Sequence, residues 1–247
     1  EFLPPPGDTH VSQWYSNKTD AASADRVIAT PGAPTLGIDA AMRVGGTISG
    51  NVTDSVTGAP LANQCIFVYS ATTSLGSCNE TAGHYVTGGL PAGQYTVEFY
   101  DGFGGPYMRQ YFDGQNDWAS AKPVTVSIGQ DASGTDAAMV KGGTFSGTVT
   151  DISTAAPLSD ICVQPEQTTP TGNFSANATC TDKYGHYITE GVPSGSYKLD
   201  FTNSGGRYIE QWYSDKLDRA SADPVSTTLG TDTRNVNVAM QRSRRTP

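Results

Sequence analysis

Three pairs of adjacent aromatic residues are the clearest candidates for binding chemistry in this chain of 247 residues. The pairs are Trp14–Tyr15, Tyr111–Phe112 and Trp212–Tyr213. Because neighbouring residues on a strand point to opposite faces, we expect one ring of each pair to enter a core and the other to face outward. An outward-facing flat ring can stack on the apolar face of a pyranose, so these six residues are candidates for binding a carbohydrate.

Each aromatic pair begins a phrase that the chain contains three times. The copies read QWYSNKTDAASADRV at 13–27, QYFDGQNDWASAKPV at 110–124 and QWYSDKLDRASADPV at 211–225. A second interpretation is therefore structural: the Ala-Ser-Ala step forms a short helical turn whose small side chains pack over the outer ring. The sequence favours this structural corner over a carbohydrate-binding surface, and the exposure of the rings distinguishes the two.

The residue types that carry most hydrolytic chemistry are sparse. The histidines are His10, His84 and His186, and neither the H-E-x-x-H motif of zinc hydrolases nor a G-x-S-x-G nucleophile turn occurs. His84 and His186 each stand between a turn glycine and a tyrosine of the predicted core, which indicates a structural role. The strand pattern predicts that Glu98 and Asp200 face solvent in equivalent positions, so a glycosidase pair of carboxylates is not expected. We therefore predict that the chain is not an enzyme.

Potential metal ligands are also few. Asp54, Asp101, Asp113 and Asp151 lie near predicted turns and could hold Ca²⁺. However, no D-x-D-x-D-G loop is present, and aspartates in turns usually bond to their own backbone. The sequence therefore predicts no cofactor and no metal site, with Ca²⁺ as the alternative.

Four cysteines stand at matching places in two similar parts of the chain. They are Cys65, Cys78, Cys162 and Cys180. No C-x-x-C pair occurs, so zinc binding is disfavoured. Pairing within each part needs only two neighbouring strands to align, and we therefore predict one disulfide in each. Disulfides of this kind indicate an oxidising, extracellular compartment.

Internal similarity extends well beyond these residues. GGTISGNVTDSVTGAPL at 45–61 returns as GGTFSGTVTDISTAAPL at 142–158, and GHYVTGGLPAGQYTVEF at 83–99 returns as GHYITEGVPSGSYKLDF at 185–201. The predicted organisation is a linker or cloning remnant at 1–10, the C-terminal part of a preceding repeat at 11–43, β-sandwich repeats at 44–140 and 141–240, and a tail at 241–247.

Within each repeat, apolar residues alternate with polar ones. Tyr95, Val97 and Phe99 alternate with Thr96 and Glu98, which is the period of a strand with one buried face. Counting such runs gives about seven strands in roughly a hundred residues, the size of an immunoglobulin-like sandwich of two sheets. The sequence therefore predicts an all-β fold of tandem, seven-stranded β-sandwich modules.

The strand and turn motifs resemble those of a known family. GGTISGNVTD, the turn before APL, and GHYVTGGLPAGQYTVEF are similar to the carboxypeptidase regulatory-like domain, a transthyretin-like or prealbumin-like β-sandwich akin to the B-type repeats of bacterial adhesins. The resemblance covers both repeats and implies a prealbumin-like module of a secreted bacterial protein. Such modules serve as spacers, adhesin stalks or companions of secreted hydrolases. B-type repeats often carry a Lys–Asn isopeptide bond; this chain has no matching repeated residues, and the disulfides are expected to replace that bond.

The composition limits the choice of partner. The formal net charge is −9, so a nucleic-acid partner is not expected, and no apolar run is long enough to insert into a membrane. We predict a non-catalytic extracellular spacer, adhesion or display segment of a larger secreted or surface protein, in contact with adjacent domains and with a cell-surface or matrix component. The alternative is a starch-binding-like carbohydrate-binding module whose partner is a polysaccharide and which accompanies a secreted hydrolase such as an amylase.

Overall fold

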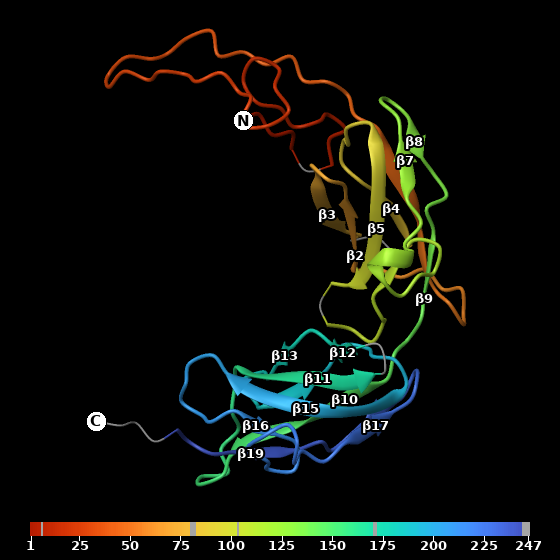
Figure 1. Cartoon of the computed structure of the whole chain (residues 1–247), viewed down its shortest axis with the longest axis vertical. Coiled ribbons are helices and arrows are strands. Elements are labelled where there is room, and N and C mark those ends of the chain that lie inside the picture. Colours follow the sequence, from red (N-terminus) through yellow and green to blue (C-terminus); the bar gives the residue numbers. More distant parts are fainter. Residues whose placement is uncertain (6, 80–82, 103, 170–171, 244–247) are drawn as a thin grey trace. The chain divides into compact units, whose positions relative to one another are not determined.

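The computed structural model describes the chain except for residues 6, 80–82, 103, 170–171 and 244–247 (Figure 1). The chain forms two compact units. Unit 1 comprises Glu1–Tyr100 and Gln110–Ala138, and unit 2 comprises Asp101–Arg109 and Met139–Pro247. Residues 101–109 connect two strands of the first repeat, yet they belong by their contacts to unit 2.

Unit 1 contains the first repeat as two sheets. One sheet has β1 (Thr47–Asp54) between β4 (His84–Val86) and β8 (Asp131–Ala132), and β9 (Ala137–Met139) also pairs with β1. The other sheet has the order β3 (Ser74–Cys78), β2 (Gln64–Tyr69), β5 (Gly93–Asp101) and β6 (Gln110–Tyr111), and β7 (Val124–Val126) also pairs with β5. A short 3₁₀ helix, η1 (Trp118–Ser120), lies between β6 and β7 along the chain.

Unit 2 repeats this arrangement. One sheet has β10 (Thr144–Asp151) between β14 (His186–Ile188) and β18 (Asp232–Thr233), with β19 (Val238–Met240) also on β10. The other has the order β12 (Gly172–Ser175), β11 (Ile161–Thr169), β15 (Gly195–Asn203) and β16 (Gln211–Trp212), with β13 (Thr179–Cys180) on β11 and β17 (Val225–Thr227) on β15. In the described part of the chain each repeat has seven strands of three residues or more. The predicted class, an all-β fold of tandem β-sandwich modules, is confirmed.

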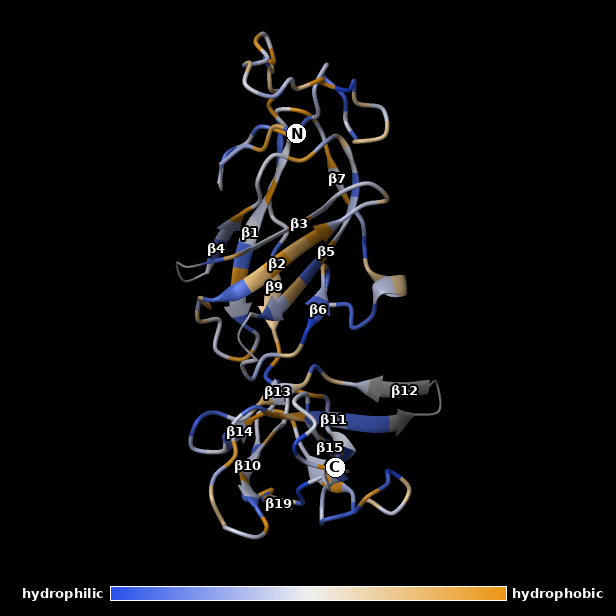
Figure 2. Ribbon diagram, turned by 90° about the vertical axis from the view of Figure 1, so that its left-hand side faces the viewer, coloured by the Kyte–Doolittle hydropathy of each residue, from blue (hydrophilic) through white to orange (hydrophobic). Residues whose placement is uncertain are grey.

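Alternation along the central strands buries one face of each sandwich. Tyr95, Val97 and Phe99 on β5 are at most 1% exposed, and the equivalent three residues of β15 are fully buried. Figure 2 shows the hydrophobic character of the neighbouring strand β2 in orange. Burial of these large side chains is the main term that stabilises each sandwich, at about 1.5–3 kcal/mol for each buried aliphatic or Phe side chain.

The opposite face of β5 and β15 is also covered, which the sequence pattern did not predict. Glu98 and Asp200 were expected to face solvent, and this is wrong: they are 5% and 9% exposed. In unit 2 the segment after β16 lies over this face, because the Lys198 ammonium donates hydrogen bonds to the carbonyls of Arg219 and Ala220 at 2.5 and 3.0 Å. Strand alternation alone cannot show that a later loop returns to cover an outer face.

The first repeat begins with main-chain bonds to the N-terminal segment. The Gly45 N–H donates to the Thr9 carbonyl at 2.8 Å, and the Gly89 N–H donates to the Asp8 carbonyl at 3.2 Å. Residues 1–46 otherwise carry no named strand (Figure 1). The N-terminal segment is therefore tied to the first repeat at Gly45 and Gly89.

Unit 2 begins in the same way. The Gly142 N–H donates to the Pro106 carbonyl at 2.8 Å, and the Gly191 N–H donates to the Gly105 carbonyl at 3.2 Å. Glycine is required here, because a Cβ on Gly142 would lie 2.4 Å from the Val192 nitrogen and one on Gly191 would lie 2.1 Å from the Pro106 oxygen. The glycines that the repeats share thus mark places where two backbones meet.

Candidate functional site

The repeated aromatic phrase forms the same tight turn in all three places. The backbones of Trp14 and Lys18 exchange hydrogen bonds of 2.7 and 3.1 Å, and Tyr111–Gln115 and Trp212–Lys216 exchange bonds of 2.7–2.8 and 3.1 Å. The two residues at the tip have positive φ in every copy; they are Ser16–Asn17, Asp113–Gly114 and Ser214–Asp215. Short polar residues and glycine tolerate this conformation best, which explains the composition of the tip.

A capped turn follows each tight turn. The Asp117 carboxylate accepts hydrogen bonds from the Ser120 backbone N–H at 3.0 Å and from its hydroxyl at 2.8 Å, at the start of η1. Asp20–Ser23 and Asp218–Ser221 make the same two bonds at 2.8–3.0 Å. Because these bonds favour the ionised form, they lower the pKa of each of the three aspartates. The phrase is therefore a local structural corner that also forms in its N-terminal copy.

The structure buries the predicted aromatic pairs to different extents. In unit 2, Trp212 is 6% exposed and Tyr213 packs against the core of the repeat. In unit 1 both rings of Tyr111–Phe112 and of Trp14–Tyr15 are half-buried. The six candidate residues are thus not one repeated exposed surface, and in unit 2 Trp212 is buried while Tyr213 is half-buried against the core.

Unit 1 instead carries five aromatic side chains in a row on the outer face of the sheet that contains β2, β5 and β6. The row runs Tyr100, Phe67, Tyr69, Trp118, Tyr111, and its successive ring centroids are 5.5, 6.0, 5.2 and 5.9 Å apart. Trp118, on η1, is 52% exposed, and the other four residues are half-buried. We call these five residues the aromatic strip.

Two rings of the aromatic strip lie nearly parallel, and a third stands upright beside them. The Phe67 ring crosses over Gly76 on β3, where an added Cβ would lie 2.4–2.7 Å from three ring atoms. The Tyr69 ring is inclined by only 21° to Phe67, whereas the Trp118 indole is inclined by 61° to Tyr69. The Tyr69 hydroxyl donates to the Glu98 carboxylate at 2.9 Å, which fixes the direction of that ring.

The equivalent positions of unit 2 are mostly polar. Where repeat 1 has Phe67, Tyr69, Tyr100 and Trp118, repeat 2 has Gln164, Glu166, Thr202 and Arg219. The ring contact between Tyr69 and Trp118 is replaced by an ion pair, in which Arg219 Nε lies 2.7 Å from Glu166 Oε2. The N-terminal copy of the phrase has Ala21 at the position of Trp118. The corner therefore forms with Trp, Arg or Ala at this position.

Sequence reasoning selected one member of the aromatic strip, Tyr111, and missed the other four. A signal was present in QCIFVY at 64–69, where Phe67 and Tyr69 occupy the positions that alternation directs outward. Trp118, within the repeated phrase, was not selected; its indole is 52% exposed and also contacts the Tyr111 ring, at 5.9 Å between centroids.

One buried carboxyl group in unit 2 has an unusual environment. Asp200 is 9% exposed, and no described residue gives its Oδ1 a hydrogen bond. Burial, followed by the negative charges of Glu210 and Glu166, raises the pKa of Asp200 to about 7. Asp200 is thus largely protonated in the folded unit below neutral pH.

We expect Asp200 to make unit 2 less stable as the pH rises. Between about pH 4 and pH 7 the folded unit binds a proton at Asp200 that the unfolded chain releases, so the free energy of unfolding falls as pH increases and levels off above pH 7. Relative to wild type, Asp200→Asn should therefore gain roughly 2 kcal/mol between pH 5 and pH 8. Urea unfolding at several pH values measures this difference.

Glu210→Gln provides a related control, because it removes one of the charges that raise the pKa of Asp200. This variant should weaken the pH dependence of the free energy of unfolding without abolishing it. A difference between Asp200→Asn and wild type that does not change with pH would contradict the assignment.

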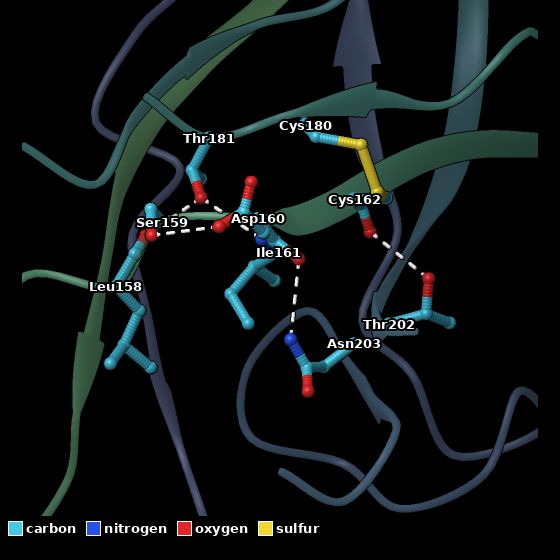
Figure 3. Close-up of a disulfide and its surroundings, with 9 residues drawn as sticks. All are labelled: Leu158, Ser159, Asp160, Ile161, Cys162, Cys180, Thr181, Thr202 and Asn203. Carbon is cyan, nitrogen blue, oxygen red and sulfur yellow. Dashed lines mark hydrogen bonds between the residues drawn. A yellow bond between two sulfur atoms is a disulfide. The ribbon is translucent and has the colours of Figure 1, made fainter. Parts of the chain in front are cut away.

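Both cysteine pairs are bonded within their own repeats. Cys65–Cys78 joins opposed residues of β2 and β3, and Cys162–Cys180 joins opposed residues of β11 and β13. Figure 3 shows the second bond beside Thr181, whose hydroxyl accepts from the Ile161 N–H at 3.0 Å and donates to the Leu158 carbonyl at 2.7 Å. The disulfide thus adds a covalent link where the strands are also held by side-chain hydrogen bonds.

The turn aspartates that were the alternative Ca²⁺ ligands bond mainly to protein groups. Asp54 and Asp151 each accept hydrogen bonds at 2.8–3.0 Å from the N–H groups two and three residues further on. Asp151 also accepts from Arg242 Nε at 2.6 Å and from the Tyr208 hydroxyl at 3.0 Å, and the arginine is the main cause of its lowered pKa. Among the described residues there is no cluster of three or more His, Cys, Asp or Glu side chains that could hold a metal ion.

No protein-family model and no curated protein matches the chain. Similar solved structures include the Bacillus anthracis TIE protein (15% identity, 80% of this chain and 34% of that one, TM-score 0.32) and a streptococcal ancillary pilin (14%, 81% and 62%, 0.32). Another is the minor pilin of Streptococcus agalactiae (12%, 81% and 97%, 0.29). The chain thus spans about a third of the first protein and less than two thirds of the second. Likenesses this distant do not assign a function.

The described residues include no helix that combines the length and the apolar character needed to traverse a bilayer.

Proposed function

We propose that the chain is a non-catalytic spacer, adhesion or display segment of a larger extracellular or cell-surface protein. The observation that carries this proposal is the repeated boundary, in which the first glycine of each repeat donates its N–H to an earlier segment of the chain, Gly45 to the Thr9 carbonyl and Gly142 to the Pro106 carbonyl. Tandem modules that each hold an earlier segment of the chain in their own fold suit a protein that carries other domains away from a surface.

The cross-links support an extracellular setting for this role. Each repeat has its own disulfide, and the described residues contain no free cysteine. Disulfides of this kind persist in oxidising compartments, and each one links two neighbouring strands of a sheet covalently and restricts the unfolded chain.

Hydrogen exchange on the full chain tests the repeated boundary. The amides of Gly142 and Gly191 should exchange much more slowly than those of the exposed residues Ser204 and Gly205, because each donates to a carbonyl of the segment 105–106. Gly191→Val should release both amides, since its side chain would collide with Pro106. Gly205→Ala, in an exposed loop of the same unit, is the control and should change neither. Rapid exchange of both amides in the wild-type chain would reject the proposal.

A second candidate function is carbohydrate binding, as in a module that accompanies a secreted polysaccharide hydrolase. The aromatic strip favours it in the first repeat. The burial of Trp212 and the ion pair of Glu166 with Arg219 disfavour it in the second.

A further inference from the structure

We propose that the aromatic strip of unit 1 is a binding site for a neutral polysaccharide. Pyranose rings would stack on the parallel faces of Phe67 and Tyr69 and against the upright indole of Trp118. This site does not depend on the spacer role, and it belongs to the first repeat alone.

The fold does not require these rings, which points to a ligand as their reason. Repeat 2 forms the same sheet and the same corner with an ion pair, Glu166 with Arg219, in place of Tyr69 and Trp118. The N-terminal copy forms the turn and its cap with Ala21 at the position of Trp118. An exposed indole on one copy of a corner that forms equally well without it costs solubility and contributes little packing.

The chemistry of the strip suits a sugar. Its rings supply apolar faces for the C–H surface of a pyranose. The Phe67 ring is supported from beneath by the strand at Gly76, so its opposite face is the one available to a ligand. Tyr69 is held by its bond to Glu98, so little side-chain entropy is lost when a ligand stacks on it.

The charges near the strip disfavour an anionic ligand. Lys122, which follows η1, is paired with Asp113 at 3.5 Å and lies over the Phe112 ring. The carboxylate of Glu98 lies directly beside Tyr69, and the whole chain carries a formal net charge of −9. Nucleic acids and acidic polysaccharides would meet repulsion here, whereas a neutral glycan would not.

The arrangement also favours a polymer over a single sugar. The five centroids follow one another at 5.2–6.0 Å from Tyr100 to Tyr111, so an extended chain can contact several rings in succession. Single contacts of this kind are weak, and they add when one chain engages several of them.

Affinity electrophoresis and isothermal titration calorimetry on the full chain test the proposal. The probes are mixed-linkage β-glucan, xylan and soluble starch as neutral polymers, alginate as an acidic polymer, and a proline-rich peptide as the other ligand that aromatic surfaces accept. We expect saturable binding of at least one neutral polymer, with a change in tryptophan fluorescence, and no binding of alginate or the peptide.

The decisive variant is Tyr69→Glu combined with Trp118→Arg, which transfers the ion pair of repeat 2 into repeat 1. It should bind the neutral polymer at least tenfold more weakly. Because the double variant replaces the hydroxyl that bonds to Glu98 with a second carboxylate, Trp118→Ala, which keeps that bond, is the variant expected to melt at close to the wild-type temperature. Trp118→Ala, the residue of the N-terminal copy, should weaken binding in the same direction, and Trp14→Phe should leave it unchanged. Absence of binding to every neutral polymer, undiminished binding by folded strip variants, or preferential binding of alginate or the peptide would each overturn the proposal.

Discussion

Replacing Gly50 with alanine should lower the free energy of unfolding of unit 1 by about 3 kcal/mol, the upper end of the usual cost of overpacking. A Cβ on Gly50 would lie 2.3 Å from the Thr135 carbonyl oxygen and 2.6 Å from its carbon. This carbonyl cannot easily move, because it accepts the Tyr85 hydroxyl at 2.6 Å and the Thr135 N–H donates to the Ser49 carbonyl at 3.1 Å. Relief of the collision must therefore break at least one buried hydrogen bond.

Gly93→Ala is the matched control for this experiment. Gly93 is also a strand glycine of unit 1, but it is exposed, and its added Cβ would make only an ordinary contact of 3.6 Å with the Tyr95 ring. This variant should change stability by less than about 0.5 kcal/mol. In differential scanning calorimetry on the full chain, Gly50→Ala should lower the melting temperature of unit 1 and leave that of unit 2 unchanged. Equal effects of the two variants would mean that the segment at Thr135 is free to shift.

The Gly50 contact also shows where sequence reasoning succeeds and where it stops. Strand alternation correctly identifies Tyr95, Val97 and Phe99 as core, because a side chain's face depends only on its position in its own strand. The role of Gly50 depends on a segment 85 positions later in the chain, which runs parallel to β1 and passes close to that residue. A repeated glycine in a strand indicates that something comes close, but the pattern does not say what.

The same limit applies to the outer faces of the two sandwiches. Glu98 and Asp200 occupy positions that alternation assigns to solvent, yet the return of a later segment over Lys198 buries this face in unit 2. The sequence shows that the returning segment carries Trp118 in unit 1 and Arg219 in unit 2. It does not show that these side chains contact Tyr69 and Glu166 on the neighbouring strand, which only the structure reveals.

Comparison of the two repeats separates what the fold requires from what one repeat has added. The turn at Trp212–Lys216, the cap at Asp218–Ser221 and the hydroxyl bond of Tyr187 to the Val236 carbonyl all have counterparts in unit 1, so they are parts of the module. The aromatic strip has no such counterpart. Because the second repeat forms the same sheets without the strip, the difference between the two copies indicates that the strip has a role other than folding.

Removing the disulfide of unit 2 should have an effect of similar size. In Cys162→Ala combined with Cys180→Ala, we expect the free energy of unfolding of unit 2 to fall by about 3 kcal/mol, because the bond closes a loop of sequence separation 18 and restricts the unfolded chain. The loss should be at least as large as for the Cys65–Cys78 bond. β13 is paired with β11 at only two residue positions, whereas β3 is paired with β2 at five.

Urea unfolding with and without a thiol reductant measures both bonds in one experiment. Reductant should lower the midpoints of both units in the wild-type chain, and only that of unit 1 in the double-alanine variant of unit 2. A variant in which all four cysteines are alanine should not respond to reductant, which controls for effects unrelated to the disulfides. A loss below about 1 kcal/mol in unit 2 would contradict this prediction. It would show that the hydrogen bonds of Thr181 with Ile161 and Leu158 hold β13 in place by themselves, and that the disulfide adds little to the free energy of unfolding.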